Sequence, residues 1–183
     1  QMKKGQFDQP FLIIFAMIVA IMILIFGFKV ILDLKERGDF TLLGDNVADL
    51  RDFARTYYNL EEDSAREIDL RVPGSIACFC FKDVSITTLS SVAPPSYNSD
   101  TAQLCGEEWT ILRGRMIGAG ESYNLFVTPA DAFSTTSFWI IEPTNLLAPP
   151  PSENPLCIPI TSNRFKAVIE NQGNQVLIKK PAP

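Results

Sequence analysis

The sequence predicts an α+β protein: a long N-terminal hydrophobic helix, then a short amphipathic helix and an antiparallel, β-sandwich-like domain. Three observations predict it. Residues 11–32 are almost wholly apolar, residues 41–64 have apolar positions at helical spacing, and from residue 65 apolar residues alternate with polar ones or form short runs. The predicted organisation is a basic, polar N-terminal leader or flank over 1–10, a transmembrane or filament-core helix over 11–34, a linker and amphipathic helix over 35–64, and a β-rich extracellular domain over 65–183.

Composition narrows the possible functions. The chain has 183 residues with a net charge of −5, so it lacks the basic footprint of a nucleic-acid-binding protein. It contains no histidine, which excludes Ser-His-Asp and Cys-His catalysis and every metal site that uses histidine. We therefore expect no enzyme, no cofactor, no metal site and no nucleic-acid partner, and the sequence identifies no small-molecule substrate.

The first apolar run reads FLIIFAMIVAIMILIFGFKVIL and carries one charge, that of Lys29. As a helix with a rise of about 1.5 Å per residue it is about 33 Å long, enough to cross a hydrocarbon core of about 30 Å. Because the run has no polar face, every side must be buried in lipid or among helices of its own kind. Lys29, one turn from the end, is expected to reach the membrane interface. The residues expected to pack helix against helix are Phe11, Ile14, Ile18, Ile21, Ile25 and Phe28.

The flanks of the apolar run favour one orientation. Lys3 and Lys4 precede it, whereas the segment over 33–39 is mixed in sign, so the positive-inside rule places the N-terminus in the cytoplasm and the C-terminal domain outside. A cleavable secretory signal is the competing interpretation. Such signals have an apolar region of about 7–15 residues followed by a small-residue cleavage site. This run is longer and no A-x-A pattern follows it, so the sequence favours a retained helix.

The segment Lys3, Lys4, Gly5 and Gln6, followed closely by a long apolar helix, resembles the class III signal peptide of archaeal type IV pilin-like proteins, the superfamily of archaellins and adhesion pilins. The resemblance implies that a prepilin peptidase cuts between Gly5 and Gln6. It also implies that the apolar helix stays on the mature protein and bundles into a filament core, with a β-rich domain outside. An uncut membrane anchor, or a cut further upstream, remains open.

The second helix is predicted over 41–64, with Asp45 or Asn46 capping its start. Its acidic residues are expected to be a solvated face rather than a cation site, because the alternating oxygen ligands and glycine turn of a calcium loop are missing. The residues expected on its apolar face are Val47, Leu50, Phe53, Ala54 and Tyr57.

Short strands are predicted beyond residue 65, and no long helical period separates them, which favours antiparallel pairing over parallel βαβ units. Pro73 and Gly74 predict a turn, and residues 171–174 predict a hairpin between the last two strands. Two proline-rich stretches, 90–100 and 148–155, are expected to be rigid extended connections. The predicted strands cover 67–72, 75–81, 109–112, 124–128, 138–142, 157–161, 164–170 and 175–179.

Four cysteines all lie beyond the apolar helix, at Cys78, Cys80, Cys105 and Cys157. Cys78 and Cys80 are two residues apart on a predicted strand, so both side chains project from one face and each is expected to pair with a distant partner. Two connectivities satisfy this condition. Two disulfides in an oxidising compartment are the preferred interpretation; a four-thiolate zinc site and free buried thiols are the alternatives.

Two further groups resemble functional sites only superficially. Gly114, Gly118 and Gly120 do not have the spacing of a phosphate loop and are expected to be flexible loop glycines. Glu107, Glu108 and Glu121 offer paired carboxylates, but nothing around them distinguishes them from surface acids.

The sequence leads to two functional hypotheses. The first is a structural subunit of an archaeal type IV pilus-like surface filament, a homopolymer assembled through the N-terminal helix after passage through the membrane, with the β domain exposed. The second is an uncleaved single-pass protein of the plasma membrane, with its N-terminus in the cytoplasm and an extracellular binding domain.

Overall fold

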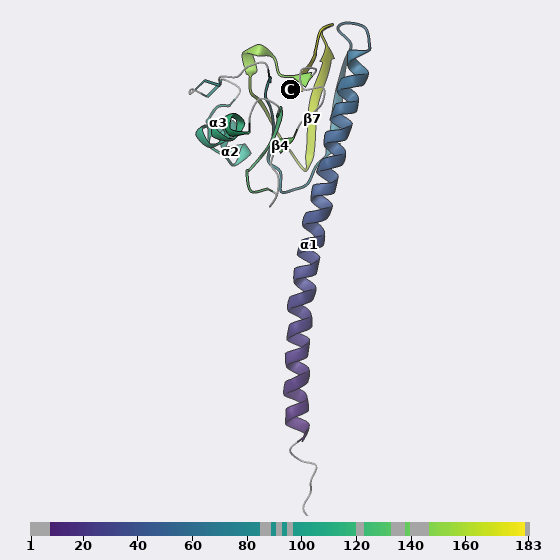
Figure 1. Ribbon diagram of the computed structural model, residues 1–183, viewed down its shortest axis with the longest axis vertical. Coiled ribbons are helices and arrows are strands. Elements are labelled where there is room, and N and C mark those ends of the chain that lie inside the picture. Colours follow the sequence, from purple (N-terminus) through teal and green to yellow (C-terminus); the bar gives the residue numbers. More distant parts are fainter. Residues whose placement is uncertain are drawn as a thin grey trace, which may run out of the picture. The chain divides into compact units, whose positions relative to one another are not determined.

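The computed structural model describes residues 8–84, 89–90, 93–94, 97–119, 123–132, 138–139 and 147–181. It divides into two compact units, Gln1–Asp39 and Phe40–Pro183. The α+β class predicted from the sequence is confirmed: a long helix, α1, is followed by two β-sheets and short helices (Figure 1). Gly5 and Gln6, the predicted processing site, lie outside the described residues.

Helix α1 runs without interruption from Asp8–Tyr58, so the two predicted helices are one. The break expected between the helix over 11–34 and the helix over 41–64 is wrong, as is the expected cap at Asp45 or Asn46. The polar segment contains no proline, and its Lys, Glu and Arg residues are good helix formers. Its one glycine, Gly38, costs about 1 kcal/mol but removes no backbone hydrogen bond, so the helix continues through it.

The part of α1 in the second unit buries one face against the sheets. Asn46 lies on this face, and its side-chain amide donates a 2.9 Å hydrogen bond to the carbonyl of Arg71. The predicted apolar face is confirmed: Val47, Leu50 and Ala54 are buried, and Phe53 and Tyr57 pack against the same core. The acidic residues of this region are exposed as predicted: Asp49, Asp52, Glu61, Glu62 and Asp63.

Two sheets are present among the described residues. The first has the order β1-β7-β8-β5; its strands are β1 (Ala65–Arg71), β5 (Leu147–Ala148), β7 (Arg164–Asn171) and β8 (Val176–Lys179). The second has the order β4-β3-β2-β6; its strands are β2 (Cys78–Phe81), β3 (Leu125–Thr128), β4 (Phe138–Trp139) and β6 (Leu156–Pro159). All pairings are antiparallel except β5 with β8, which is parallel. Seven of the predicted strands overlap observed ones; β5 was not predicted.

Strand β2 separates two cores. Phe79 and Phe81 point into the sandwich core between the two sheets and α1, where the Phe79 ring lies 4.8 Å from that of Phe165. Cys78 and Cys80 point to the opposite face of the sheet, into a second core, which we call the disulfide core. Because both faces are covered, all four residues of β2 are buried. The disulfide core comprises Cys78, Cys80, Leu89, Tyr97, Cys105, Trp109, Leu112, Met116, Phe126 and Cys157.

The hairpin between β7 and β8 is confirmed, and Asn171 ties it to the end of α1. The Asn171 amide donates to the carbonyls of Leu60, at 2.8 Å, and Tyr58, at 3.4 Å, while its Oδ1 accepts from the Gly173 amide at 2.8 Å. Gly173 has a φ of 79°, a conformation that favours glycine. Asn171 is 1% exposed, and its side chain satisfies three backbone groups where the hairpin meets the end of α1.

Two short helices, α2 (Ser99–Cys105) and α3 (Trp109–Gly118), cover the other face of the second sheet (Figure 1). Strand 109–112 is therefore a wrong prediction. Its aromatic and β-branched residues suggested a strand, but Trp109, Leu112 and Met116 are buried at helical spacing.

Helix α2 begins within the last two residues of the stretch over 90–100, which the sequence predicts to be an extended connection. It has clear end signals: the Asn98 side chain accepts from the Thr101 amide at 2.8 Å, and Gly106 ends the helix with a φ of 66°. The second proline-rich stretch likewise begins at the last residue of β5 and contains the short 3-10 helix η1 (Pro151–Glu153).

Candidate functional site

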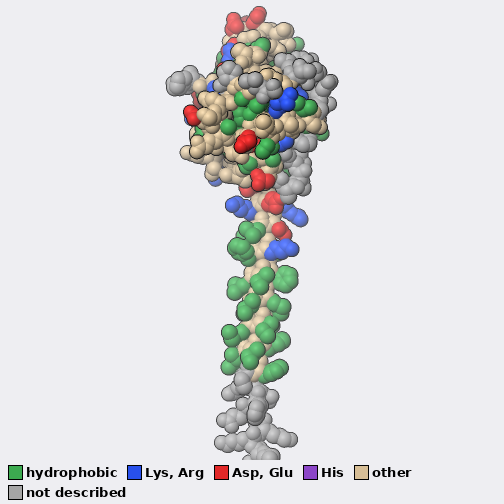
Figure 2. All heavy atoms as spheres, turned by 90° about the vertical axis from the view of Figure 1, so that its left-hand side faces the viewer, with side chains coloured by type: hydrophobic (Ala, Val, Ile, Leu, Met, Phe, Trp, Pro, Cys, Tyr) green, Lys and Arg blue, Asp and Glu red, His purple; other side chains and the backbone are tan. Residues whose placement is uncertain are grey.

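The first unit presents an apolar helix surface. Eighteen large apolar side chains between Phe11 and Leu34 are between 48% and 77% exposed, and Figure 2 shows hydrophobic side chains along this part of α1. The helix is long and apolar enough to cross a membrane by its length and composition. The six residues predicted to pack between helices are all exposed, from 51% for Ile18 to 77% for Phe11, so the unit itself does not bury them.

Charged side chains follow the apolar segment directly. Figure 2 shows basic and acidic groups on the helix beyond the hydrophobic side chains. In the sequence, Lys29 lies near the end of the apolar run, and Asp33, Lys35, Glu36, Arg37 and Asp39 follow it. A change from apolar to mixed charge along one helix is the pattern expected where a helix leaves hydrocarbon for water.

All four cysteines form disulfides, Cys78 with Cys105 and Cys80 with Cys157. The expectation that Cys78 and Cys80 each pair with a distant partner is confirmed, and the zinc and free-thiol alternatives are excluded. Cys80 and Cys157 are directly opposite each other on β2 and β6, whereas Cys78 ties the end of α2 to the sheet. Paired cysteines are typical of proteins in oxidising, extracellular compartments.

Glu107, expected to be a surface acid, is buried. Its Oε2 pairs with Nη1 of Arg115 on α3, and the Arg115 Nη2 donates a 2.9 Å hydrogen bond to the carbonyl of Val127 on β3. The Tyr97 hydroxyl donates a 2.6 Å hydrogen bond to the Glu107 carbonyl. These contacts fix the α2–α3 connection over the second sheet, and the sequence pattern contains no signal for them.

The other residues of the two groups that resemble functional sites, the acids and the glycines, lie partly outside the described residues. Glu108 is exposed at the start of α3, as expected, and Glu121 lies outside the described residues. Gly114 and Gly118 are inside α3 rather than in a loop, so that expectation is wrong; Gly120 lies outside the described residues. Both helical glycines have open space where a side chain would stand.

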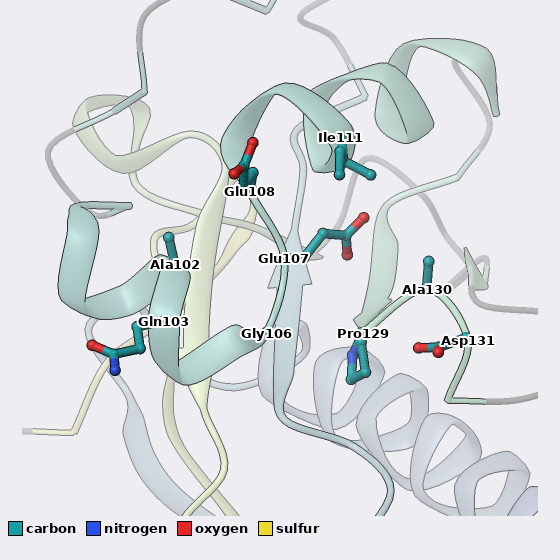
Figure 3. A pocket seen from close by; sticks show the side chains of 9 residues that line it. All are labelled: Ala102, Gln103, Gly106, Glu107, Glu108, Ile111, Pro129, Ala130 and Asp131. Atoms are coloured by element: carbon teal, nitrogen blue, oxygen red, sulfur yellow. The ribbon is translucent and has the colours of Figure 1, made fainter.

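A hollow of about 510 Å³ opens on the second unit between α2, the start of α3 and the turn after β3 (Figure 3). Three acidic residues line it: Glu107 from the α2–α3 connection, Glu108 from the start of α3 and Asp131 from the turn. Most of the remaining lining is apolar and is formed by Ala102, Ile111, Pro129 and Ala130. Across the described part of the chain, no group of three His, Cys, Asp or Glu residues is placed to hold a metal ion.

Tyr97 gives this region a pH signature. Burial, followed by the negative charge of Glu107, raises the pKa of Tyr97 from 10.0 to about 12. Between these two values the unfolded chain releases a proton that the folded protein keeps, so stability is full below pH 10 and falls as the pH rises toward 12.

Unfolding of the wild-type protein followed across this alkaline range should therefore show a declining free energy of unfolding. In Tyr97→Phe the part of the decline caused by Tyr97 should vanish. The variant should also start about 1 kcal/mol less stable, because the hydrogen bond to the Glu107 carbonyl is lost. An unchanged slope in Tyr97→Phe would contradict this assignment.

The structure thus separates two features: an exposed apolar helix on the first unit and a carboxylate-lined hollow beside the disulfide core on the second. The sequence indicated the helix and the cysteines but not the hollow. Comparison of the chain with protein-family models, curated proteins and solved structures found no match.

Proposed function

We propose that this protein is a structural subunit of a type IV pilus-like surface filament of the archaeal kind, assembled through the apolar part of α1. The observation that carries the proposal is the exposure of eighteen large apolar side chains between Phe11 and Leu34. Leaving each such side chain in water costs roughly 1.5–3 kcal/mol, so the helix needs lipid or other helices around it. The filament core would supply those helices.

The arrangement of the apolar residues supports packing among copies. Phe11, Ile14, Ile18, Ile21, Ile25 and Phe28 recur at alternating intervals of three and four residues. This spacing places them along one side of the helix, where a neighbouring helix would contact them. The other sides are apolar as well, so several neighbours can pack around each helix.

The second unit supports a location outside the cell. Two disulfides hold it together, and such bonds persist in oxidising compartments. An extracellular filament subunit would need bonds of this kind, because its globular part coats the outside of the filament.

A second function, an uncleaved membrane-anchored envelope protein, rests on a different observation. The apolar segment has the length of one bilayer crossing and ends at a set of mixed charges. A single anchor needs no contact between copies.

Site-specific crosslinking separates the two functions. Because all four native cysteines form disulfides, Ile18→Cys introduces a single free thiol. In native surface material a filament predicts oxidant-induced covalent dimers through this position and filaments in electron micrographs. N-terminal sequencing of the same material should begin at Gln6.

The matched control is Asp49→Cys, on the exposed side of the same helix in the second unit. It should crosslink much less than Ile18→Cys. Monomers at both positions, an intact N-terminal segment and no filaments would contradict the filament and support the single anchor.

A further inference from the structure

We propose that the hollow between α2, the start of α3 and the turn after β3 binds the terminal ammonium or guanidinium group of an alkyl chain. This binding site is separate from the apolar helix and does not depend on filament assembly. It is built around Glu107, whose side chain points from the α2–α3 connection toward Ala130 and Asp131 (Figure 3).

Glu107 has an unused acceptor. Its side chain is 4% exposed, and only Oε2 is engaged, by Arg115. The other oxygen, Oε1, is buried and has no hydrogen-bond partner. A buried carboxylate oxygen without a donor costs about 1–3 kcal/mol or more, so a donor that enters from the hollow would be stabilised there.

The charge around the hollow selects a cation. Glu108 and Asp131 are exposed carboxylates on its lining, and neither forms an ion pair among the described contacts. The described residues that line the hollow include three acids, Glu107, Glu108 and Asp131, and no Lys or Arg; of the three, Glu107 is paired with Arg115. A positively charged donor therefore gains attraction from the rim as well as a hydrogen bond at Glu107.

The shape and apolar lining of the hollow favour a ligand whose charged group is attached to an alkyl chain. Ala102, Ile111, Pro129 and Ala130 supply apolar surface, and Ile111 is 54% exposed there. A methylene chain laid on these groups would lose its contact with water while its charged end reaches the carboxylates. The volume of about 510 Å³ accommodates an aliphatic chain with a charged end.

Two kinds of ligand carry a charged group on an alkyl chain: a free alkyl amine and a Lys or Arg side chain of a second copy. The test uses the full chain in detergent micelles, titrated with cadaverine and agmatine while the amide resonances of Gly106 and Glu108 are followed. We expect saturable binding of both compounds that weakens with added salt. Pentanediol, which has the stem of cadaverine without its charges, should not bind.

The double variant E108Q/D131N removes the two rim charges and leaves the buried Glu107–Arg115 pair intact. Losing two exposed carboxylate contacts should weaken cadaverine binding about tenfold. The matched control D49N/E67Q removes the same two charges from exposed positions outside the hollow and should bind as the wild type does. Equal melting temperatures of the two variants would show that folding is unaffected.

Self-association distinguishes the sources. If cadaverine lowers the association of wild-type chains in sedimentation and E108Q/D131N lowers it too, the occupant is a side chain of a second copy. If cadaverine binds and association is unchanged, the occupant is a free amine. The proposal is overturned if neither amine binds, if pentanediol binds equally well, if D49N/E67Q loses binding as much as E108Q/D131N, or if only calcium binds at these residues.

Discussion

Deletion of residues 1–39 is expected to leave a product that is soluble in water without detergent. The deletion removes the eighteen large apolar side chains exposed between Phe11 and Leu34. It retains Phe40–Pro183, which contains both cores and both disulfides. The expected product sediments as a discrete species without detergent and retains the near-ultraviolet circular dichroism of packed aromatic residues.

The matched control is a deletion of residues 1–58, which removes the apolar helix together with the rest of α1. Leu43 and Leu50 are fully buried in the sandwich core, as Ala54 nearly is, so this product loses part of its core. Truncating one buried Leu to Ala already costs about 2–5 kcal/mol, and here several such side chains disappear together. We expect it to be unfolded or aggregated. If the shorter deletion still required detergent, or if both deletions behaved alike, the division of α1 into an apolar part and a core part would be wrong.

Removing the disulfide between Cys80 and Cys157 is expected to destabilise the protein more than removing the other one. This bridge joins residues 77 positions apart, and Cys78 and Cys105 are 27 apart. The entropy of closing loops of these lengths in the unfolded chain corresponds to about 4.5 and 3.5 kcal/mol. The paired variants C80A/C157A and C78A/C105A should therefore differ by about 1 kcal/mol in denaturant-induced unfolding.

The two variants should also differ in where they loosen. β2 and β6 remain hydrogen-bonded neighbours when Cys80 and Cys157 are replaced, so strand pairing should persist in that variant. Replacing Cys78 and Cys105 frees the end of α2 from the sheet, and hydrogen exchange should rise in Ser99–Cys105 first. A larger loss of stability in C78A/C105A would show that native contacts of α2, rather than loop closure, dominate.

The sequence could predict those elements whose signal is carried by neighbouring residues. Phe165, Ala167 and Ile169 alternate on β7, and all three are fully buried in the sandwich core. The apolar face of α1 around Leu50 was found from helical spacing in the same way. Cys78 and Cys80 share a face because side chains alternate along a strand, which required each to find a distant partner.

Other features depended on contacts between distant segments. The segment starting at Trp109 has residues that suit a strand, yet it is a helix because that conformation places Trp109, Leu112 and Met116 in the disulfide core. Strand β5 is two residues long and carries no periodic pattern; its pairing with β8 defines it. The burial of Glu107 depends on Arg115, eight positions away, and on Tyr97, ten positions away.

By itself the sequence determined that this protein has an apolar helix, an α+β architecture with short strands, and cysteines that need distant partners. These properties follow from composition and local periodicity, which act between residues a few positions apart. Tertiary structure alone decided the connectivity of the disulfides, the burial of Glu107 and the hollow lined by Glu107, Glu108 and Asp131. Each of these depends on which segments, distant in sequence, bury their surfaces against one another. The free energy of that burial is a property of the packed chain rather than of any one segment.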